Sequence, residues 1–179
     1  HPDDEVLGVG GTIERHRAAG DEVFVRVAYR CRLEPSLDVR WWNLEQGTDP
    51  KRNVEFDIGG VQPDIVYTHH GGDINADHRA LHEAVMVACR PYAAPSVKSI
   101  RTFHTPSSTE WGDGFRPTLY VDITDHMDAK LEAMAFYASE MRPAPHPRSA
   151  EMLRARAAVW GSEAGYAYAE AFQVERDRW

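Results

Sequence analysis

Residues 63–90 read PDIVYTHHGGDINADHRALHEAVMVACR, and they carry the strongest signal for the fold class. Pro63 introduces residues 64–68, whose β-branched and aromatic side chains are typical of a buried strand. The glycine pair that follows permits a tight turn. Residues 77–90 then carry apolar side chains at helical spacing until Pro91 ends the helix. A strand followed closely by a helix is the unit from which α/β folds are built.

The same alternation extends along the rest of the chain. We expect further strands at 22–28, 99–103, 118–122 and 170–174, and further helices at 10–19, 125–140 and 149–160. Helices that alternate with apolar strands indicate an α/β sandwich around a mostly parallel central sheet. Sites in such sheets form at the carboxyl ends of strands, so residues 69–73 lie where a site is expected.

Residues 29–60 do not fit this pattern, because they contain Arg-rich, Trp-Trp and Gly-Gly segments without a convincing regular element. A structureless connection of this length is unusual in a compact domain, so 29–60 is either a long substrate loop or a region from which residues are missing. We expect a single domain over 1–179 that lacks an N-terminal strand and part of 29–60. The reason for the first gap is that His1 opens a dense reactive cluster with nothing before it to hold it.

The composition argues against several classes of protein. The chain has 28 acidic and 20 basic residues, a formal net charge of -8, and no basic cluster, which argues against nucleic-acid or anionic-membrane binding. No apolar run is long enough for a transmembrane segment. Cys31 and Cys89 are too few for a disulfide framework, so we expect a reduced, cytoplasmic protein.

The first cluster of reactive residues is His1-Pro-Asp-Asp4-Glu. A histidine and an aspartate three residues apart in a turn can both reach one metal ion, while Asp3 between them stays available as a base. The alternative for this cluster is a helix cap or a solvated turn.

The second cluster is residues 68–79, THHGGDINADHR, in which Asn75 or Asp77 can cap the following helix and His78 lies in its first turn. Two histidines and one carboxylate around zinc leave a position open for water, which is the arrangement of a hydrolytic site. His82 lies four residues after His78 and is a rival ligand, but the apolar stretch around it favours a packed or supporting histidine.

Both clusters resemble the metal motifs of a known family. His1-Pro-Asp-Asp-Glu-Val-Leu-Gly-Val-Gly-Gly-Thr12 resembles the opening signature of the LmbE/PIG-L-like de-N-acetylases, and residues 63–79 are similar to that family's second metal motif. A third stretch, Arg142-Pro-Ala-Pro-His-Pro-Arg-Ser149, is similar to part of the family's C-terminal end. The resemblance covers nearly the whole chain except 29–60, and its specificity comes from the presence of the first two motifs together.

The resemblance implies a Rossmann-like three-layer α/β sandwich and the zinc-dependent hydrolysis of an N-acetylglucosamine-type amide, with release of acetate. It makes His1, Asp4 and His78 the metal ligands and Asp3 the general base. The substrate it implies is a small amino sugar, whether a glycoside, a glycolipid or a nucleotide sugar. Family members often form homo-oligomers, and they usually have a helix in the region that matches 29–60.

One position departs from the family pattern. Some relatives have a histidine three residues before the last metal ligand, where it helps to stabilise the oxyanion, and here that position is Asn75, a neutral donor. His70 or His146 could supply the missing proton donor. His146 is slightly favoured because prolines stiffen its loop, although a structural loop histidine is an equal alternative. We also expect His70, Asp73 and Arg142 to contact substrate, Arg142 through a phosphate or carboxylate group.

Two other functions would use the same residues. A non-haem iron(II) oxygenase also binds its metal through two histidines and one carboxylate, but such enzymes commonly place a His-x-Asp pair on a β-barrel, whereas this chain has His-x-x-Asp in an α/β pattern. A catalytically inactive sugar-binding module is the third candidate. The intact Asp3 beside Asp4 argues against it.

Overall fold

The computed structural model describes residues 3–27 and 50–178. Its helices are α1 (Asp4–Ala19), α2 (Pro50–Val61), α3 (Ala76–Ala88), α4 (Met127–Ala135) and α5 (Ala150–Ala164), with short 3-10 turns η1 (Thr109–Trp111) and η2 (Thr124–His126). Its strands are β1 (Ile65–His69), β2 (Ser99–Phe103), β3 (Leu119–Asp122) and β4 (Ala169–Asp177). They form one sheet in the order β1-β2-β4-β3.

This sheet is mixed. β1 and β2 run parallel, with His69 opposite Phe103, so the carboxyl ends of both strands lie at one edge. β4 lies between β2 and β3 and is antiparallel to both. The α/β class is therefore confirmed, whereas the expected mostly parallel sheet is not confirmed for the described residues. The reason is that the chain returns from α5 in the opposite direction and places β4 within the sheet.

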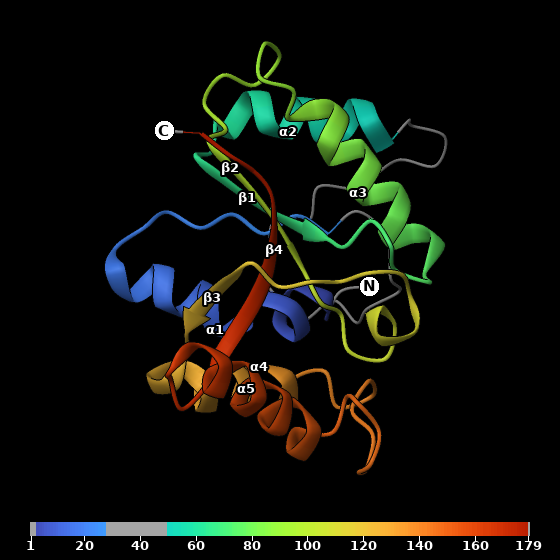
Figure 1. The fold of residues 1–179 in the computed structure, drawn as a ribbon. Coiled ribbons are helices and arrows are strands. Elements are labelled where there is room, and N and C mark those ends of the chain that lie inside the picture. The colour runs from blue at the N-terminus through green and yellow to red at the C-terminus, as the bar shows by residue number, and fades with distance from the viewer. Residues whose placement is uncertain (1–2, 28–49, 179) are drawn as a thin grey trace.

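Helices cover both faces of the sheet (Figure 1). Ile100 of β2 packs on one face with Val54 of α2 and Val85 of α3. Phe103, three residues further along the same strand, packs on the other face with Val9 of α1. Side chains alternate between the faces of a strand, so burial of both residues requires helices on each side. α4 packs against α1, and α5 packs against β3 and β4.

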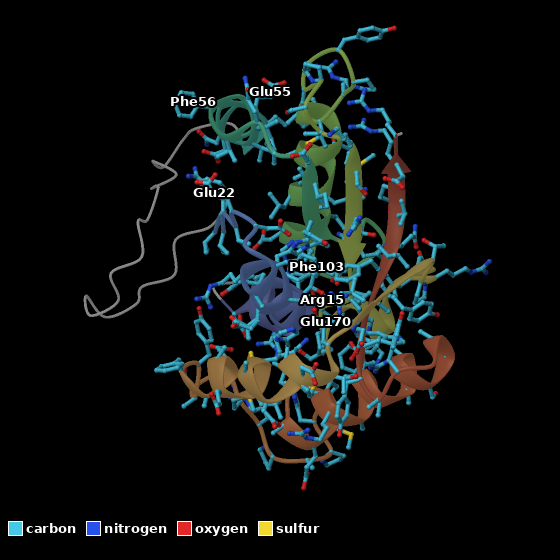
Figure 2. All side chains as sticks on the ribbon, turned by 90° about the vertical axis from the view of Figure 1, so that its left-hand side faces the viewer. Arg15, Glu22, Glu55, Phe56, Phe103 and Glu170 are labelled. Atoms are coloured by element: carbon cyan, nitrogen blue, oxygen red, sulfur yellow. The ribbon has the colours of Figure 1, made fainter. Side chains whose placement is uncertain are left out.

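α1 begins at Asp4, well before the helix expected at 10–19, and its glycine-rich first half accounts for the difference. A Cβ at Gly8 would overlap the ring of Phe103, so this helix approaches the sheet at a point where a side chain is missing. Figure 2 shows Phe103 beside α1. Glycine has a low helix propensity, and the contact that favours it here lies far along the chain.

A buried ion pair holds the middle of α1. Lys130 Nζ lies 2.6 Å from Glu170 Oε1 and donates a second hydrogen bond to the Leu7 carbonyl oxygen at 2.9 Å. The Glu170 carboxylate accepts from the backbone N–H groups of Gly11 at 3.0 Å and Thr12 at 2.7 Å, and Figure 2 shows Glu170 beside the helix. Leu7 and Gly11 are four residues apart, so the Lys130–Glu170 pair binds backbone groups at both ends of one turn of α1. The middle of α1 is thereby fixed relative to α4 and β4.

Most of the expected elements are present. The strands predicted at 64–68, 99–103 and 118–122 correspond to β1, β2 and β3, and β4 is longer than expected. Helices α3 and α5 are confirmed, whereas the helix predicted over 125–140 is shorter and consists of η2 followed by α4. Among the described helices, none has the length and apolar character needed to cross a membrane.

Two expectations about local structure are wrong. Residues 22–27 form no strand, and the apolar side chains of Phe24 and Val25 are 61% and 47% exposed. Part of the supposedly irregular region 29–60 is α2, in which Val54 and Ile58 recur at helical spacing and pack against α3. The glycine pair near the end of α2 obscured this period. A helix here agrees with the resemblance, and residues 28–49 lie outside the described part of the chain.

Candidate metal centre

Three buried side chains meet where the first turn of α1 approaches the carboxyl end of β1. Asp4 opens α1, His69 ends β1, and His78 lies in the first turn of α3. Asp4 Oδ2 lies 3.1 Å from Nε2 of His69 and 3.1 Å from Nε2 of His78, and the two imidazole rings stack with their centroids 4.1 Å apart. The ligand atoms of the three residues all lie within 4.8 Å of one another, so the cluster could hold a metal ion.

The charges in this cluster favour an ionised Asp4. Burial by itself raises the pKa of the Asp4 carboxyl, but hydrogen bonds from His69 and His78 outweigh burial and hold that pKa well below its usual range. Burial lowers the pKa of His69, and Asp4 only partly offsets it. Burial also acts to lower the pKa of His78, but its hydrogen bonds to Asp4 and Asp73 raise it. A carboxylate between two imidazoles is a donor set that attracts a cation.

Asp73 orients His78 from the side opposite Asp4. Its Oδ2 lies 3.3 Å from Nδ1 of His78, which leaves Nε2 of that ring directed toward Asp4. The Asp73 carboxylate also accepts hydrogen bonds from the hydroxyls of Ser108 and Thr109, the latter at 2.5 Å. Burial raises the pKa of Asp73, but these three partners keep it well below the usual range. A carboxylate on the far nitrogen of a ligating histidine fixes its tautomer and ring orientation.

Asp3 is fully buried beside this cluster and pairs with an arginine from the C-terminal half of the chain. Arg148 Nη1 lies 3.1 Å from Asp3 Oδ2 and 3.1 Å from Glu140 Oε2, and its Nε donates to the Ser107 hydroxyl at 2.8 Å. Burial raises the pKa of Asp3, and the guanidinium of Arg148 opposes that rise. Asp3 Oδ1 is buried and has no hydrogen-bond partner among the described residues. Arg148 therefore holds Oδ2 of Asp3, whereas Oδ1 has no such contact among the described residues.

Sequence reasoning missed two residues of this centre. Of the two consecutive histidines, His70 was considered as a candidate and His69 was not. Because side chains alternate along β1, two consecutive residues point to opposite faces of the sheet. The histidine doublet at the end of a predicted strand was the signal that could have found it. Arg148 stands inside the third motif, but it is separated from Asp3 by 145 residues, and nothing local links the two.

The expected ligands are only partly described. Asp4 and His78 are brought together, whereas His1 lies outside the described residues. His82, the rival ligand, donates from Nδ1 to the His69 carbonyl oxygen at 3.0 Å. That contact fits the supporting role expected for it.

Asn75 and His70 lie next to the centre and take part in the structure around it. Asn75 is the N-cap of α3, and its Oδ1 accepts from the backbone N–H of Asp77 at 2.9 Å. This hydrogen bond uses the side-chain oxygen of Asn75 and not its NH2 group. His70 is buried and donates from Nε2 to the Asp113 carbonyl oxygen at 2.8 Å, which ties the turn after β1 to the loop after η1.

His146 and Arg142 lie in the segment between α4 and α5. His146 is half-buried, and its Nδ1 accepts from the backbone N–H of Arg148 at 3.1 Å. It therefore supports the segment whose arginine reaches Asp3. Arg142 is exposed and donates to the carbonyl oxygens of Ser139 at 2.5 Å and Met141 at 2.9 Å. Within the described ranges, these bonds hold the Arg142 guanidinium against its own segment.

Comparison with known proteins identifies the fold. No family profile and no curated protein sequence matches this chain. Among solved structures, the conserved protein TT1542 from Thermus thermophilus matches with a TM-score of 0.72 and 23% identity, over 96% of this chain and 90% of that one. The N,N'-diacetylchitobiose deacetylase from Pyrococcus horikoshii matches with a TM-score of 0.64 and 22% identity, over 98% and 81%. The A40926 pseudoaglycone deacetylase Dbv21 matches with a TM-score of 0.67 and 18% identity, over 98% and 94%.

These similarities extend over nearly the whole chain. The protein therefore has the LmbE/PIG-L-like fold, which confirms at the level of the fold the resemblance carried by its motifs. Two of the three similar structures are named as deacetylases. The buried Asp4–His69–His78 cluster lies at the strand edge where α/β sheets place their sites.

Proposed function

We propose that this protein is a metal-dependent de-N-acetylase that hydrolyses the N-acetyl group of an N-acetylglucosamine-type amino sugar and releases acetate. The observation that carries the proposal is the Asp4–His69–His78 cluster with the buried carboxylate of Asp3 beside it. The printed names of two proteins with the same fold, an N,N'-diacetylchitobiose deacetylase and a pseudoaglycone deacetylase, support this class of reaction.

The donor set fits zinc. One carboxylate and two imidazoles are common ligands of catalytic zinc, and three protein ligands leave a further position for water or substrate. We propose that Asp4 and His78 bind the metal together with His1. His69 is the rival for the third place, because its Nε2 lies 3.1 Å from Asp4 Oδ2. When bound, zinc supplies Lewis acidity toward the acetyl carbonyl and the attacking water.

We propose that Asp3 acts as the general base. Its Oδ1 takes a proton from the attacking water, whose oxygen forms a bond to the acetyl carbon, while Arg148 holds Oδ2 in position. The side-chain NH2 of Asn75 donates to the carbonyl oxygen as negative charge develops there. The carbon–nitrogen bond then breaks, and the leaving amine takes its proton from Asp3 or from His146. The products are acetate and a free amino sugar.

The remaining proposed contacts to the substrate come from the sequence, with one change. Asp73 was expected to touch substrate, but its oxygens are taken by Ser108, Thr109 and His78, and we propose that it acts by orienting His78. His70 and Arg142 are the other proposed substrate contacts. The substrate is a small amino sugar, whether a glycoside, a glycolipid or a nucleotide sugar.

The test is acetate release by the zinc-loaded protein from a panel of N-acetylglucosamine derivatives. Replacement of Asp3 by Asn removes the base and is expected to lower kcat by about 100-fold to 10,000-fold while zinc stays bound. Asp64→Asn, at a carboxylate that is 71% exposed, is the matched control. Full activity of Asp3→Asn would contradict the role of Asp3. Oxygen consumption by an iron-loaded protein without acetate release would instead identify an oxygenase.

A further inference from the structure

A hollow lies at the carboxyl end of β2, next to residues that support the metal centre. Its walls include His104, Thr109, Glu110, Phe115, Arg156 and Trp160, and its volume is about 470 Å³. The side chains come from the turn after β2, from η1 and the loop that follows it, and from α5. We refer to it as the His104 pocket. Its volume lies in the range of pockets that bind small ligands.

The His104 pocket and the metal centre share structural elements. Thr109 lines the pocket, and its hydroxyl donates to Asp73, the residue that orients His78. His70, which follows β1, packs edge-on against Phe115 with the ring centroids 5.3 Å apart. Because β1 and β2 are parallel neighbours, the residues after each strand emerge at one edge of the sheet. The pocket therefore lies next to residues that support the metal centre.

Aromatic rings are part of the pocket walls. The His104 ring meets Phe115 and Trp160 edge-on, with a centroid distance of 5.5 Å to each. Phe115 and Trp160 are half-buried, so part of each ring remains accessible. A flat, partly exposed aromatic surface is suited to the C–H face of a sugar ring, because both surfaces are apolar and their partial charges are complementary.

The walls of the pocket also include polar groups of opposite charge. Arg156 Nη2 lies 3.5 Å from Glu110 Oε1, and the guanidinium lies over the Trp160 ring at 5.7 Å from its centroid. Burial lowers the pKa of His104 to about 4, so its ring is neutral near pH 7. His104 Nδ1 is buried and has no hydrogen-bond partner among the described residues. Arg116 also lines the pocket, but it is exposed to solvent, which screens its charge.

We propose that the His104 pocket binds an uncharged pyranose ring, namely the sugar attached to the N-acetylated one, so that the enzyme favours an oligosaccharide over a monosaccharide. This inference rests on the proposed deacetylase function. A sugar hydroxyl can accept from Arg156 and donate to Glu110 at the same time. A carboxylate on the ring would instead face Glu110, and an ammonium group would face Arg156, so the pair selects for an uncharged ring.

The binding test uses the zinc-loaded full chain and cellobiose, which has two uncharged pyranose rings and no amide group to hydrolyse. We expect NMR titration to show a Kd that rises about tenfold or more in Trp160→Ala, because an aromatic anchor is lost. Glu110→Gln, which keeps the shape of the side chain, is expected to weaken binding as well. Val159→Ala, at a residue on the same helix that is 56% exposed, is the control and should bind as the unchanged protein does.

Equal affinity of Trp160→Ala and the unchanged protein for cellobiose would overturn the proposal. If Trp160→Ala does not fold, the Glu110→Gln titration decides in the same way. Tighter binding of glucuronate than of glucose by the unchanged protein would overturn the uncharged class of ligand.

The kinetic test compares kcat/KM for N,N'-diacetylchitobiose with kcat/KM for N-acetylglucosamine. We expect the unchanged protein to favour the disaccharide, and we expect this ratio to fall about tenfold in Trp160→Ala through KM. An unaltered ratio in an active Trp160→Ala variant would contradict the pocket while leaving the deacetylase function intact. Loss of cellobiose binding in Trp160→Ala, in a protein that hydrolyses no amide, would leave the pocket intact and contradict the function.

Discussion

His78 and His104 are both almost fully buried, at 2% and 6% exposure, but they meet different partners. His78 lies between two carboxylates, with Nε2 3.1 Å from Asp4 and Nδ1 3.3 Å from Asp73. His104 lies among aromatic rings, and Glu110 comes only within 3.9 Å of its Nε2. The pKa of His78 is accordingly raised, and the pKa of His104 is lowered to about 4.

The difference shows that burial alone does not assign a role to a histidine. Desolvation lowers the pKa of both rings, and only the hydrogen bonds to carboxylates reverse this for His78. Paired carboxylates make His78 a candidate ligand with a fixed orientation. The aromatic surroundings make His104 a neutral wall of a pocket. The predictions below test this division.

The largest expected effect is the loss of metal from His78→Ala. Removal of a ligand should abolish stoichiometric zinc binding and lower kcat/KM by more than about 100-fold, the upper end expected for a supporting residue. His104→Ala should keep one zinc per chain, as measured by elemental analysis after dialysis. An equal loss of zinc from both variants would remove the distinction between the two histidines.

The third ligand is decided by the same measurement. His1→Ala should lose zinc as His78→Ala does if the family resemblance assigns the ligand correctly. His69→Ala should then retain zinc with lower affinity. If His69→Ala loses zinc and His1→Ala retains it, the Asp4–His69–His78 cluster is itself the metal site.

A smaller effect is expected from Asp73→Asn. The substitution keeps the hydrogen-bonding shape but removes the charge that orients His78, and zinc affinity should fall by about 10-fold to 100-fold. Competition with a chromophoric chelator measures this directly. Asp77→Asn, at an exposed residue four positions further along, is the matched control. Unchanged affinity in Asp73→Asn would show that Asp4 alone suffices to orient the ring.

The next prediction concerns His104 and the pH dependence of the free energy of unfolding. Its pKa is about 4 in the folded protein, below the ordinary 6.5, so the unfolded chain binds the proton first as pH falls. The stability that the neutral ring contributes above pH 6.5 is therefore lost progressively toward pH 4. Between pH 7.5 and 4.5 this amounts to about 2 kcal/mol. In urea denaturation of the metal-free protein, the free energy of unfolding of His104→Leu should therefore vary with pH by about 2 kcal/mol less than that of the unchanged protein. An equal variation in the two proteins would contradict the lowered pKa of His104.

The smallest expected effect concerns Asn75, which caps the helix that carries His78. Asn75→Ala should lower the free energy of unfolding by about 1 kcal/mol, whereas Asn75→Ser retains a capping oxygen and should stay close to the original stability. Any fall in kcat that Asn75→Ser still shows reports the loss of the amide donor. Thermal unfolding and acetate release, measured on both variants, separate the cap from the oxyanion role.

Local signals predicted most of the elements that build the fold. The β-branched and aromatic run in β1 and the helical period with its terminal proline in α3 act over a few residues, and they are read correctly. Signals that depend on distant contacts were misread. The helix α1 tolerates its glycines because Gly8 leaves room for the ring of Phe103, a contact that lies far along the chain. The short strand predicted at 170–174 gave no sign that β4 is longer and antiparallel to both of its neighbours.

The sequence by itself determined part of the centre, because Asp3, Asp4 and His78 stand in motifs whose spacing already suggests a metal and a base. Only the tertiary structure decided which other residues join them. His69 meets Asp4 across 65 residues, and Arg148 meets Asp3 across 145. Helix and turn signals act between near neighbours, whereas these pairings depend on how the strands and helices pack. The pocket at His104 depends on packing in the same way, since Trp160 reaches it from α5.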